Sequence, residues 1–173
     1  MSTSRQASRL IAVWGLVLGS LLGMAGTFVP SAQVRGLLWG LDGVALVVAS
    51  SLLAMTYFRK GNDVVAAGFL VFVAGETLVL ASAAMELVRT GPVFGAGVSL
   101  WAASLILLSV TREAAPWVRI VGIVAGLLFA AVAVQLFLGG ALTPLSRPLP
   151  FFAYPFLVAT LLGWAWEAYR ARI

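Results

Sequence analysis

Cysteine and histidine are both absent from this 173-residue chain, and charged residues make up only 10% of it. Without cysteine there is no disulfide bond, no catalytic thiol and no thiolate ligand for a metal. Without histidine the chain also lacks the usual ligands of zinc and of haem iron. The motifs of zinc peptidases, serine hydrolases and nucleotide-binding loops do not occur either. We therefore expect a protein that is not an enzyme and that carries no metal or other cofactor.

The chain is instead dominated by apolar residues. They make up 62% of the sequence, and the mean hydropathy is +1.07. An ordinary soluble domain is roughly 25% charged, so this chain has too little polar surface to cover a globule in water. Residues 1–173 are therefore expected to form a single integral membrane domain whose main partner is the lipid bilayer.

Six segments are long and apolar enough to cross the hydrocarbon core, which takes about 20 helical residues. They cover about residues 10–29, 37–58, 64–87, 93–111, 117–139 and 151–169. Charged turns and prolines separate them, such as "RKGND" at 59–63 and the proline-rich stretch 139–150. The sequence thus predicts an all-α, polytopic transmembrane bundle of six helices joined by short loops.

Lysine and arginine are unevenly divided between the two sides of this topology. The side that holds both termini receives eight of them: Arg5, Arg9, Arg59, Lys60, Arg112, Arg119, Arg170 and Arg172. The other side receives three, Arg35, Arg89 and Arg147. Because basic residues stay on the cytoplasmic side, both termini are expected in the cytoplasm. The predominance of arginine suggests a bacterial cytoplasmic membrane, and no basic cluster is dense enough to indicate nucleic-acid binding.

Two features of the spans leave alternatives open. Arg5 and Arg9 precede the first apolar run as they would in a cleaved signal peptide, although that run is longer than usual for one. Glycines recur at steps of four, which favours close contacts between helices in lipid. These are Gly15, Gly19 and Gly23 in the first span and Gly122 and Gly126 in the fifth. The contacts are expected inside the bundle, or alternatively in a homo-oligomer.

Polar residues interrupt three spans and are the best candidates for a site. Glu76 lies in "VFVAGETLVL", twelve residues into its span, at a depth of about 18 Å. Asp42 is expected about 8 Å below the outer end of the second span, and Gln135 falls in the outer third of the fifth. All three are therefore expected in the outer half of the bundle, where we consider them candidate ligands for an ion or a polar molecule.

Burying an ionised acid near a helix centre costs about 2.5–3.5 kcal/mol, so Glu76 is expected to face the bundle interior. At neutral pH it is expected to be protonated or paired with a basic group. Arg147, in the outer loop 139–150, is a possible counter-charge, and Tyr154 could join it in a lid over the acids. The same residues also fit a plain connector that rests at the lipid headgroups, and Asp42 could simply extend to the interface.

Two functions compete on this basis. In the first, the protein is a small transporter or an ion- or proton-conducting protein with an outward-facing polar pocket around Glu76 and Asp42. In the second, it is a non-catalytic subunit that stabilises a larger membrane complex, and the acids only hold helices together. An enzyme acting on lipid through the two carboxyl groups is the weakest alternative, because their expected depths differ.

Overall fold

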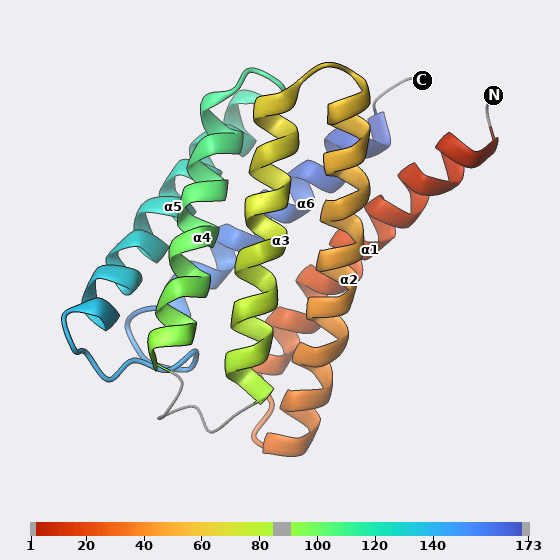
Figure 1. Ribbon diagram of the computed structural model, residues 1–173. Coiled ribbons are helices and arrows are strands. Elements are labelled where there is room, and N and C mark those ends of the chain that lie inside the picture. The colour runs from red at the N-terminus through yellow and green to blue at the C-terminus, as the bar shows by residue number, and fades with distance from the viewer. Residues whose placement is uncertain (1–2, 85–90, 171–173) are drawn as a thin grey trace.

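The computed structural model describes residues 3–84 and 91–170, and within these ranges the chain is helical and contains no strand (Figure 1). The helices are α1 (Thr3–Phe28), α2 (Ala32–Arg59), α3 (Asp63–Ala84), α4 (Gly91–Val110), α5 (Pro116–Phe137) and α6 (Tyr154–Arg170), with a short 3-10 turn, η1 (Phe151–Ala153), before α6. By length and composition, six segments of the described chain could each cross a membrane. The predicted all-helical fold with six long apolar helices is confirmed.

The helix boundaries differ from the predicted spans for local reasons. The helix α1 begins seven residues before the predicted position 10, because the polar residues ahead of the apolar run continue the same helix. The helix α2 begins at Ala32, where the Ser31 hydroxyl accepts a hydrogen bond from Val34 N at 3.4 Å. The end of the predicted third span, residues 85–87, lies outside the described residues, as do Glu86 and Arg89.

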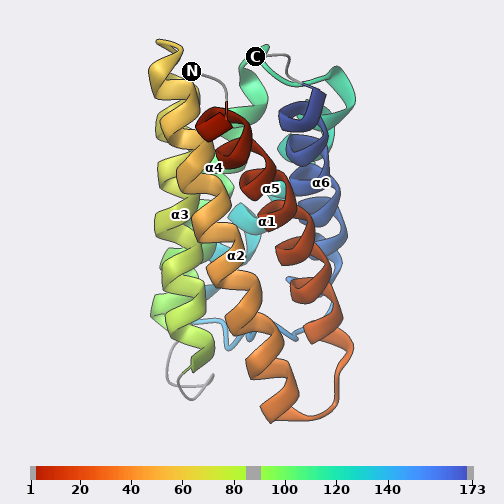
Figure 2. The ribbon, with the colours of Figure 1, turned by 90° about the vertical axis from the view of Figure 1, so that its right-hand side faces the viewer.

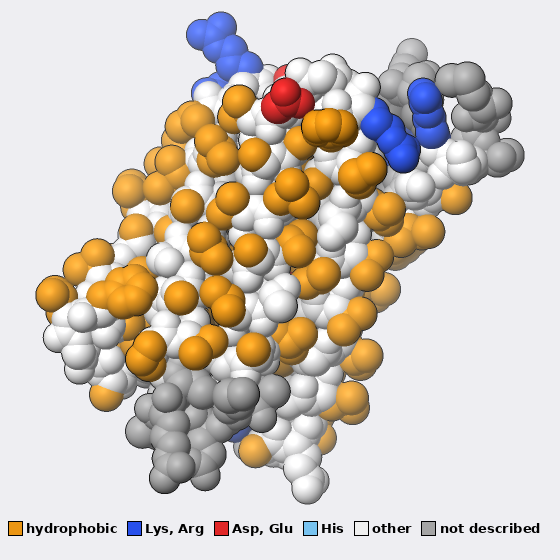
Figure 3. Space-filling model, in the orientation of Figure 1, with side chains coloured by type: hydrophobic (Ala, Val, Ile, Leu, Met, Phe, Trp, Pro, Cys, Tyr) orange, Lys and Arg blue, Asp and Glu red, His pale blue; other side chains and the backbone are white. Residues whose placement is uncertain are grey.

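The six helices form a closed ring. Each helix packs against the next one in the chain, and α6 packs against α1 to complete the circle (Figure 2). Both termini lie at one end, together with the turns at 60–62 and 111–115, and we call this the termini end (Figure 1). The connections at 29–31 and 138–150 lie at the opposite end, called the far end below (Figure 1). Apolar side chains cover the flank of the bundle, whereas charged side chains gather at the termini end (Figure 3).

Glycines allow the neighbouring helices to approach closely. A Cβ atom added to Gly15 would lie 2.8 Å from Ala49 Cβ in α2, and one added to Gly126 would lie 3.2 Å from the Ala102 carbonyl oxygen in α4. Both glycine-rich stripes therefore face neighbouring helices of the same chain. Gly36, near the start of α2, differs because nothing described lies within 4 Å of its added Cβ.

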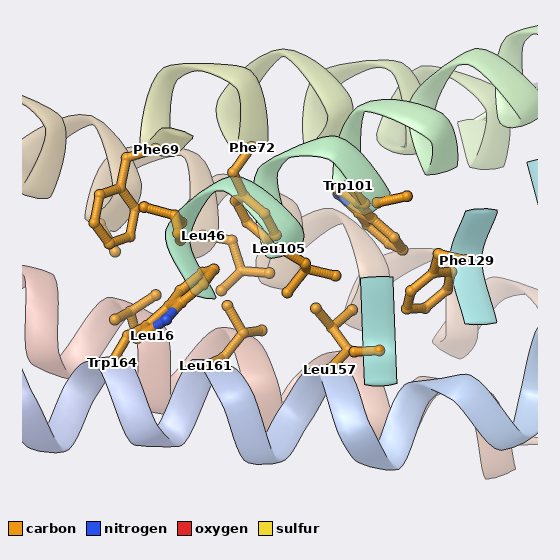
Figure 4. Packing of buried hydrophobic residues seen from close by; sticks show 14 of the residues in the cluster. Leu16, Leu46, Phe69, Phe72, Trp101, Leu105, Phe129, Leu157, Leu161 and Trp164 are labelled. Carbon is orange, nitrogen blue, oxygen red and sulfur yellow. The ribbon is translucent and has the colours of Figure 1, made fainter. Parts of the chain in front are cut away.

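A chain of aromatic rings runs through the centre of the ring of helices. Successive ring centroids are 5.1–6.2 Å apart. In order from the termini end, the chain consists of Tyr57, Phe69, Trp164, Phe72, Trp101, Phe129 and Tyr154. The members come from α2, α3, α4, α5 and α6, and five of them are seen together in the core (Figure 4). Contacts of this geometry stabilise the core beyond simple burial.

Candidate functional site

Asp42 of α2 and Glu76 of α3 both line one cavity of about 60 Å³. The wall is completed by residues of α1, α4 and α6 and by Pro144 from the loop at the far end. Asp42 lies ten residues beyond the start of α2, about 15 Å along the helix, because α2 begins five residues before the predicted span. The longer helix places Asp42 well away from its own end. The structure thus brings Asp42 and Glu76 together inside the bundle.

Glycines of α1 make room for the carboxyl group of Asp42. A Cβ atom added to Gly23 would lie 2.5 Å from Asp42 Oδ2, and one added to Gly19 would lie 3.2 Å from Oδ1. The glycine stripe of α1 therefore accommodates an acidic side chain as well as a neighbouring helix. Despite this close fit, Asp42 Oδ1 is buried and has no hydrogen-bond partner among the residues that the structure describes.

Glu76 is more deeply buried, with only 3% of its surface exposed. Its inward orientation is the one expected from the cost of exposing a charge to lipid. The Oε1 atom would lie 3.3 Å from a Cβ added to Gly43, the residue after Asp42, so the Glu76 carboxyl group packs against the turn of α2 that carries Asp42. The Trp101 indole lies beside Glu76. Its N–H does not reach hydrogen-bond geometry, and Glu76 Oε2 also has no partner among the described residues.

Three polar side chains of the wall already donate hydrogen bonds to the backbone of α1. The Ser20 hydroxyl donates a hydrogen bond to the Leu16 carbonyl at 2.7 Å, one helical turn away. The Thr27 hydroxyl donates to the Met24 carbonyl at 2.7 Å. The Trp39 indole N–H donates to the Gly23 carbonyl at 3.3 Å and ties α2 to α1. The buried wall groups without a partner among the described residues are then Asp42 Oδ1, Glu76 Oε2 and the Trp101 N–H, and the two carboxyl oxygens are the ones that can accept hydrogen bonds from a guest.

Arg147 does not supply the expected counter-charge. It is exposed, and its guanidinium carbon lies 4.3 Å from the centroid of the Phe151 ring, outside the cavity wall. The other basic residue described near this end, Arg35, donates to the Val29 carbonyl at 3.2 Å and stacks over Trp39. None of the described residues in the wall is basic. The loop does contribute Pro144, and Tyr154 lines the cavity, so part of the expected lid is present.

Gln135 also lies outside the cavity wall. It is exposed on α5, on the same side of that helix as Leu138, which is 83% exposed, and Leu127, which is 59% exposed. The sequence indicated the depth of Gln135 but not the face of the helix on which it lies. Conversely, sequence reasoning missed Trp39 and Trp101 as wall residues. The spacing of Trp39, Asp42 and Leu46 at i, i+3 and i+7 places all three on one helical face and was the signal available for Trp39.

The acids at the termini end are arranged differently. Glu113 accepts a hydrogen bond from the Asn62 side chain at 2.8 Å. Glu167 accepts one from the backbone N–H of Ala115 at 3.2 Å, next to the start of α5. They border a smaller cavity of about 20 Å³ that Tyr57 also lines. These two acids have structural partners, whereas Asp42 and Glu76 each keep a buried oxygen atom without one.

Electrostatics decides what the larger cavity can accept. Two carboxyl groups side by side in an apolar interior cannot both stay ionised unless a positive charge compensates them. No described basic side chain of the wall does so. Across residues 3–84 and 91–170, no three acidic residues come together as they would in a protein-built metal centre. The arrangement therefore suits protons on the carboxyl groups or a guest that brings its own positive charge.

Comparisons of the chain with protein-family models, with curated proteins and with solved structures found no match.

Proposed function

We propose that this protein is a multi-pass protein of a bacterial cytoplasmic membrane that binds a cation between Asp42 and Glu76 and transports it. The observation that carries the proposal is the pair of buried carboxyl groups, each with an oxygen lacking a hydrogen-bond partner, in one cavity whose described wall has no basic residue. Intramembrane acids that face a cavity mark ion and proton pathways more often than they serve structure alone.

The direction of access follows from the distribution of basic residues. The excess of lysine and arginine at the termini end favours a cytoplasmic location for that end. The far end, with Pro144 and Tyr154 next to the cavity, then faces the outside. Trp101 of the aromatic chain lines this cavity and Trp164 lines the smaller one at the termini end, with Phe72 in contact with both rings. In the proposed transporter these rings close the site on the cytoplasmic side.

The proposal is tested by neutralising each acid. Glu76→Gln and Asp42→Asn keep size and hydrogen-bonding capacity but remove the negative charge that compensates a cation. We expect each to reduce cation-driven or pH-driven flux in reconstituted vesicles by more than tenfold. Asp63→Asn removes a charge at the termini end, outside the walls of both cavities, and should leave flux within about twofold. Flux that is unchanged in both cavity variants would show that the acids serve structure alone.

A smaller change separates the geometry of the site from its charge. Gly23→Ala adds a methyl group 2.5 Å from Asp42 Oδ2, so the carboxyl group must move. Overpacking of this kind costs about 1–3 kcal/mol. We expect flux or cation binding to fall about tenfold. Gly36→Ala adds the same methyl group in open space and is the matched control. If Gly23→Ala and Gly36→Ala give the same flux and the same cation binding, Asp42 does not pack closely against α1.

One observation favours the second candidate, a subunit of a larger membrane complex. Gly36 and Gly40 have nothing described within 4 Å of an added Cβ, and Leu37 and Leu41 beside them are 62% and 51% exposed. Such a small-residue face is suited to a partner helix. Gentle detergent extraction followed by mass measurement distinguishes the two candidates. A second polypeptide that is retained by the native chain and lost with Gly40→Leu would favour the complex.

A further inference from the structure

We propose that the guest of the Asp42–Glu76 cavity is a small organic ammonium ion, a protonated primary amine with a short alkyl group. This inference rests on the proposed cation binding at the same site and names the chemical class of the cation. It follows from three properties of the wall: the number of oxygen atoms free to bind, the character of the remaining surface, and the volume.

The wall offers few oxygen atoms for an inorganic cation. Ca²⁺ takes six to eight oxygen ligands and Mg²⁺ six, and selective potassium sites replace the hydration shell with rings of carbonyl oxygens. Here the backbone is helical around both acids, so its carbonyl groups are engaged within the helices. The Ser20 and Thr27 hydroxyl groups donate to carbonyl groups of α1, so besides the two carboxyl groups the described wall offers only single hydroxyl oxygens to a metal ion. An ammonium group needs fewer ligands, because three N–H donors can be satisfied by two carboxyl groups.

The rest of the wall matches the remainder of an organic cation. Trp101 and Tyr154 bring aromatic rings to the cavity, and a cation within about 6 Å of such a ring is attracted to it. Leu46, Leu157 and Leu161 supply an aliphatic surface that would contact an alkyl group. A metal ion gains nothing from the aliphatic surface, whereas an alkylammonium ion uses both parts of the wall.

The volume also favours a molecule over a bare proton. A single water needs about 10–15 Å³ of cavity measured with a water-sized probe. The cavity of about 60 Å³ is several times larger, which is enough for a guest of a few heavy atoms. Proton transfer between two carboxyl groups requires no such space. The size therefore points to short amines such as methylamine and ethylamine in their protonated forms.

Isothermal titration calorimetry on the purified full-length protein in detergent tests this directly. The probes are ethylammonium, sodium and potassium chloride at equal ionic strength, with ethanol as the neutral analogue. We expect ethylammonium to bind at least tenfold more tightly than either metal ion, and ethanol to show no binding. Glu76→Gln and Asp42→Asn should each weaken ethylammonium binding more than tenfold. Glu113→Gln and Asp63→Asn should change it less than twofold, and thermal unfolding verifies that every variant is folded.

The alternative results separate this inference from the proposed function. Tighter binding of sodium or potassium that depends on Glu76 overturns the ammonium assignment and leaves a cation site in place. Ethylammonium binding that is equal in the native chain and both cavity variants also overturns it, because the guest then sits elsewhere. If no cation binds in a way that depends on either acid, this inference and the proposed function both fail.

Discussion

Replacing Trp164 with alanine is expected to lower the free energy of unfolding by at least about 2 kcal/mol, since loss of a buried tryptophan side chain typically costs about 3–5 kcal/mol. Trp164 is 6% exposed and makes edge contacts with Phe69 at 5.1 Å and with Phe72 at 5.9 Å. In lipid the contribution from water exclusion is smaller, but the lost packing contacts are the same. Thermal or denaturant unfolding in detergent measures the change.

The same substitution should also alter transport. Trp164 lines the small cavity at the termini end, and Leu161, one turn earlier in α6, lines the large one. Removing the indole leaves Phe72 as the main ring between them. We expect a passive leak of cations through reconstituted vesicles, and we expect the further change Glu76→Gln to suppress it. The leak tests the proposed pathway, because a purely structural core would lose stability without conducting.

Trp166→Ala is the matched control on the same helix. Trp166 is 46% exposed and stacks on Tyr169 outside the core, with the Arg170 guanidinium over its ring at 4.4 Å. Its loss should change the free energy of unfolding by less than about 1 kcal/mol and produce no leak, as expected for a surface position. If Trp164→Ala and Trp166→Ala change the free energy of unfolding and the cation leak equally, the aromatic chain does not separate the two cavities.

The number and character of the helices could be predicted from the sequence because both depend on composition along the chain. Runs of about 20 apolar residues mark the spans regardless of how the helices pack. The inward orientation of Glu76 was also predictable, since exposing a charge to lipid is costly on every other face. For Asp42 the sequence left open an extension to the interface, and the structure places it in the cavity wall with Glu76.

The rotation of each helix about its axis was not predictable in the same way. In water the buried face is marked by a contrast between apolar and polar sides, but a helix in lipid is apolar all round. Buried Phe129 and exposed Leu127 of α5 are equally apolar, so nothing showed that Gln135 shares the outer side. The position of Arg147 depends on its contact with Phe151 in an irregular loop, for which no periodic pattern exists.

A further close glycine contact, between α3 and α4, escaped the step-of-four pattern. Gly75 of α3 and Gly97 of α4 face each other, and neither was singled out as part of a stripe. A Cβ atom added to Gly97 would lie 3.0 Å from the Gly75 carbonyl oxygen and 2.9 Å from Val79 N. One added to Gly75 would lie 2.9 Å from the Gly97 carbonyl oxygen. The two backbones therefore touch, which only a pair of small residues permits.

Replacing Gly97 with valine is accordingly expected to force α3 and α4 apart. Overpacking costs about 1–3 kcal/mol where side chains can adjust, and here the obstacle is backbone that cannot rotate away. Glu76 follows Gly75 directly, and Trp101 lies one turn beyond Gly97, so separation of the helices also displaces two walls of the cavity. We expect the free energy of unfolding to fall by at least about 2 kcal/mol, which is in the upper half of the range for overpacking. We also expect cation binding to be lost.

Gly36→Val introduces the same side chain where nothing described lies within 4 Å, and it replaces a poor helix former with a better one. This substitution should leave the free energy of unfolding and the affinity for cations within about twofold of the native values. If Gly97→Val unfolds at the same temperature as Gly36→Val, the close approach of α3 and α4 is wrong. If Gly97→Val is destabilised but still binds cations with native affinity, the position of Glu76 does not depend on this contact.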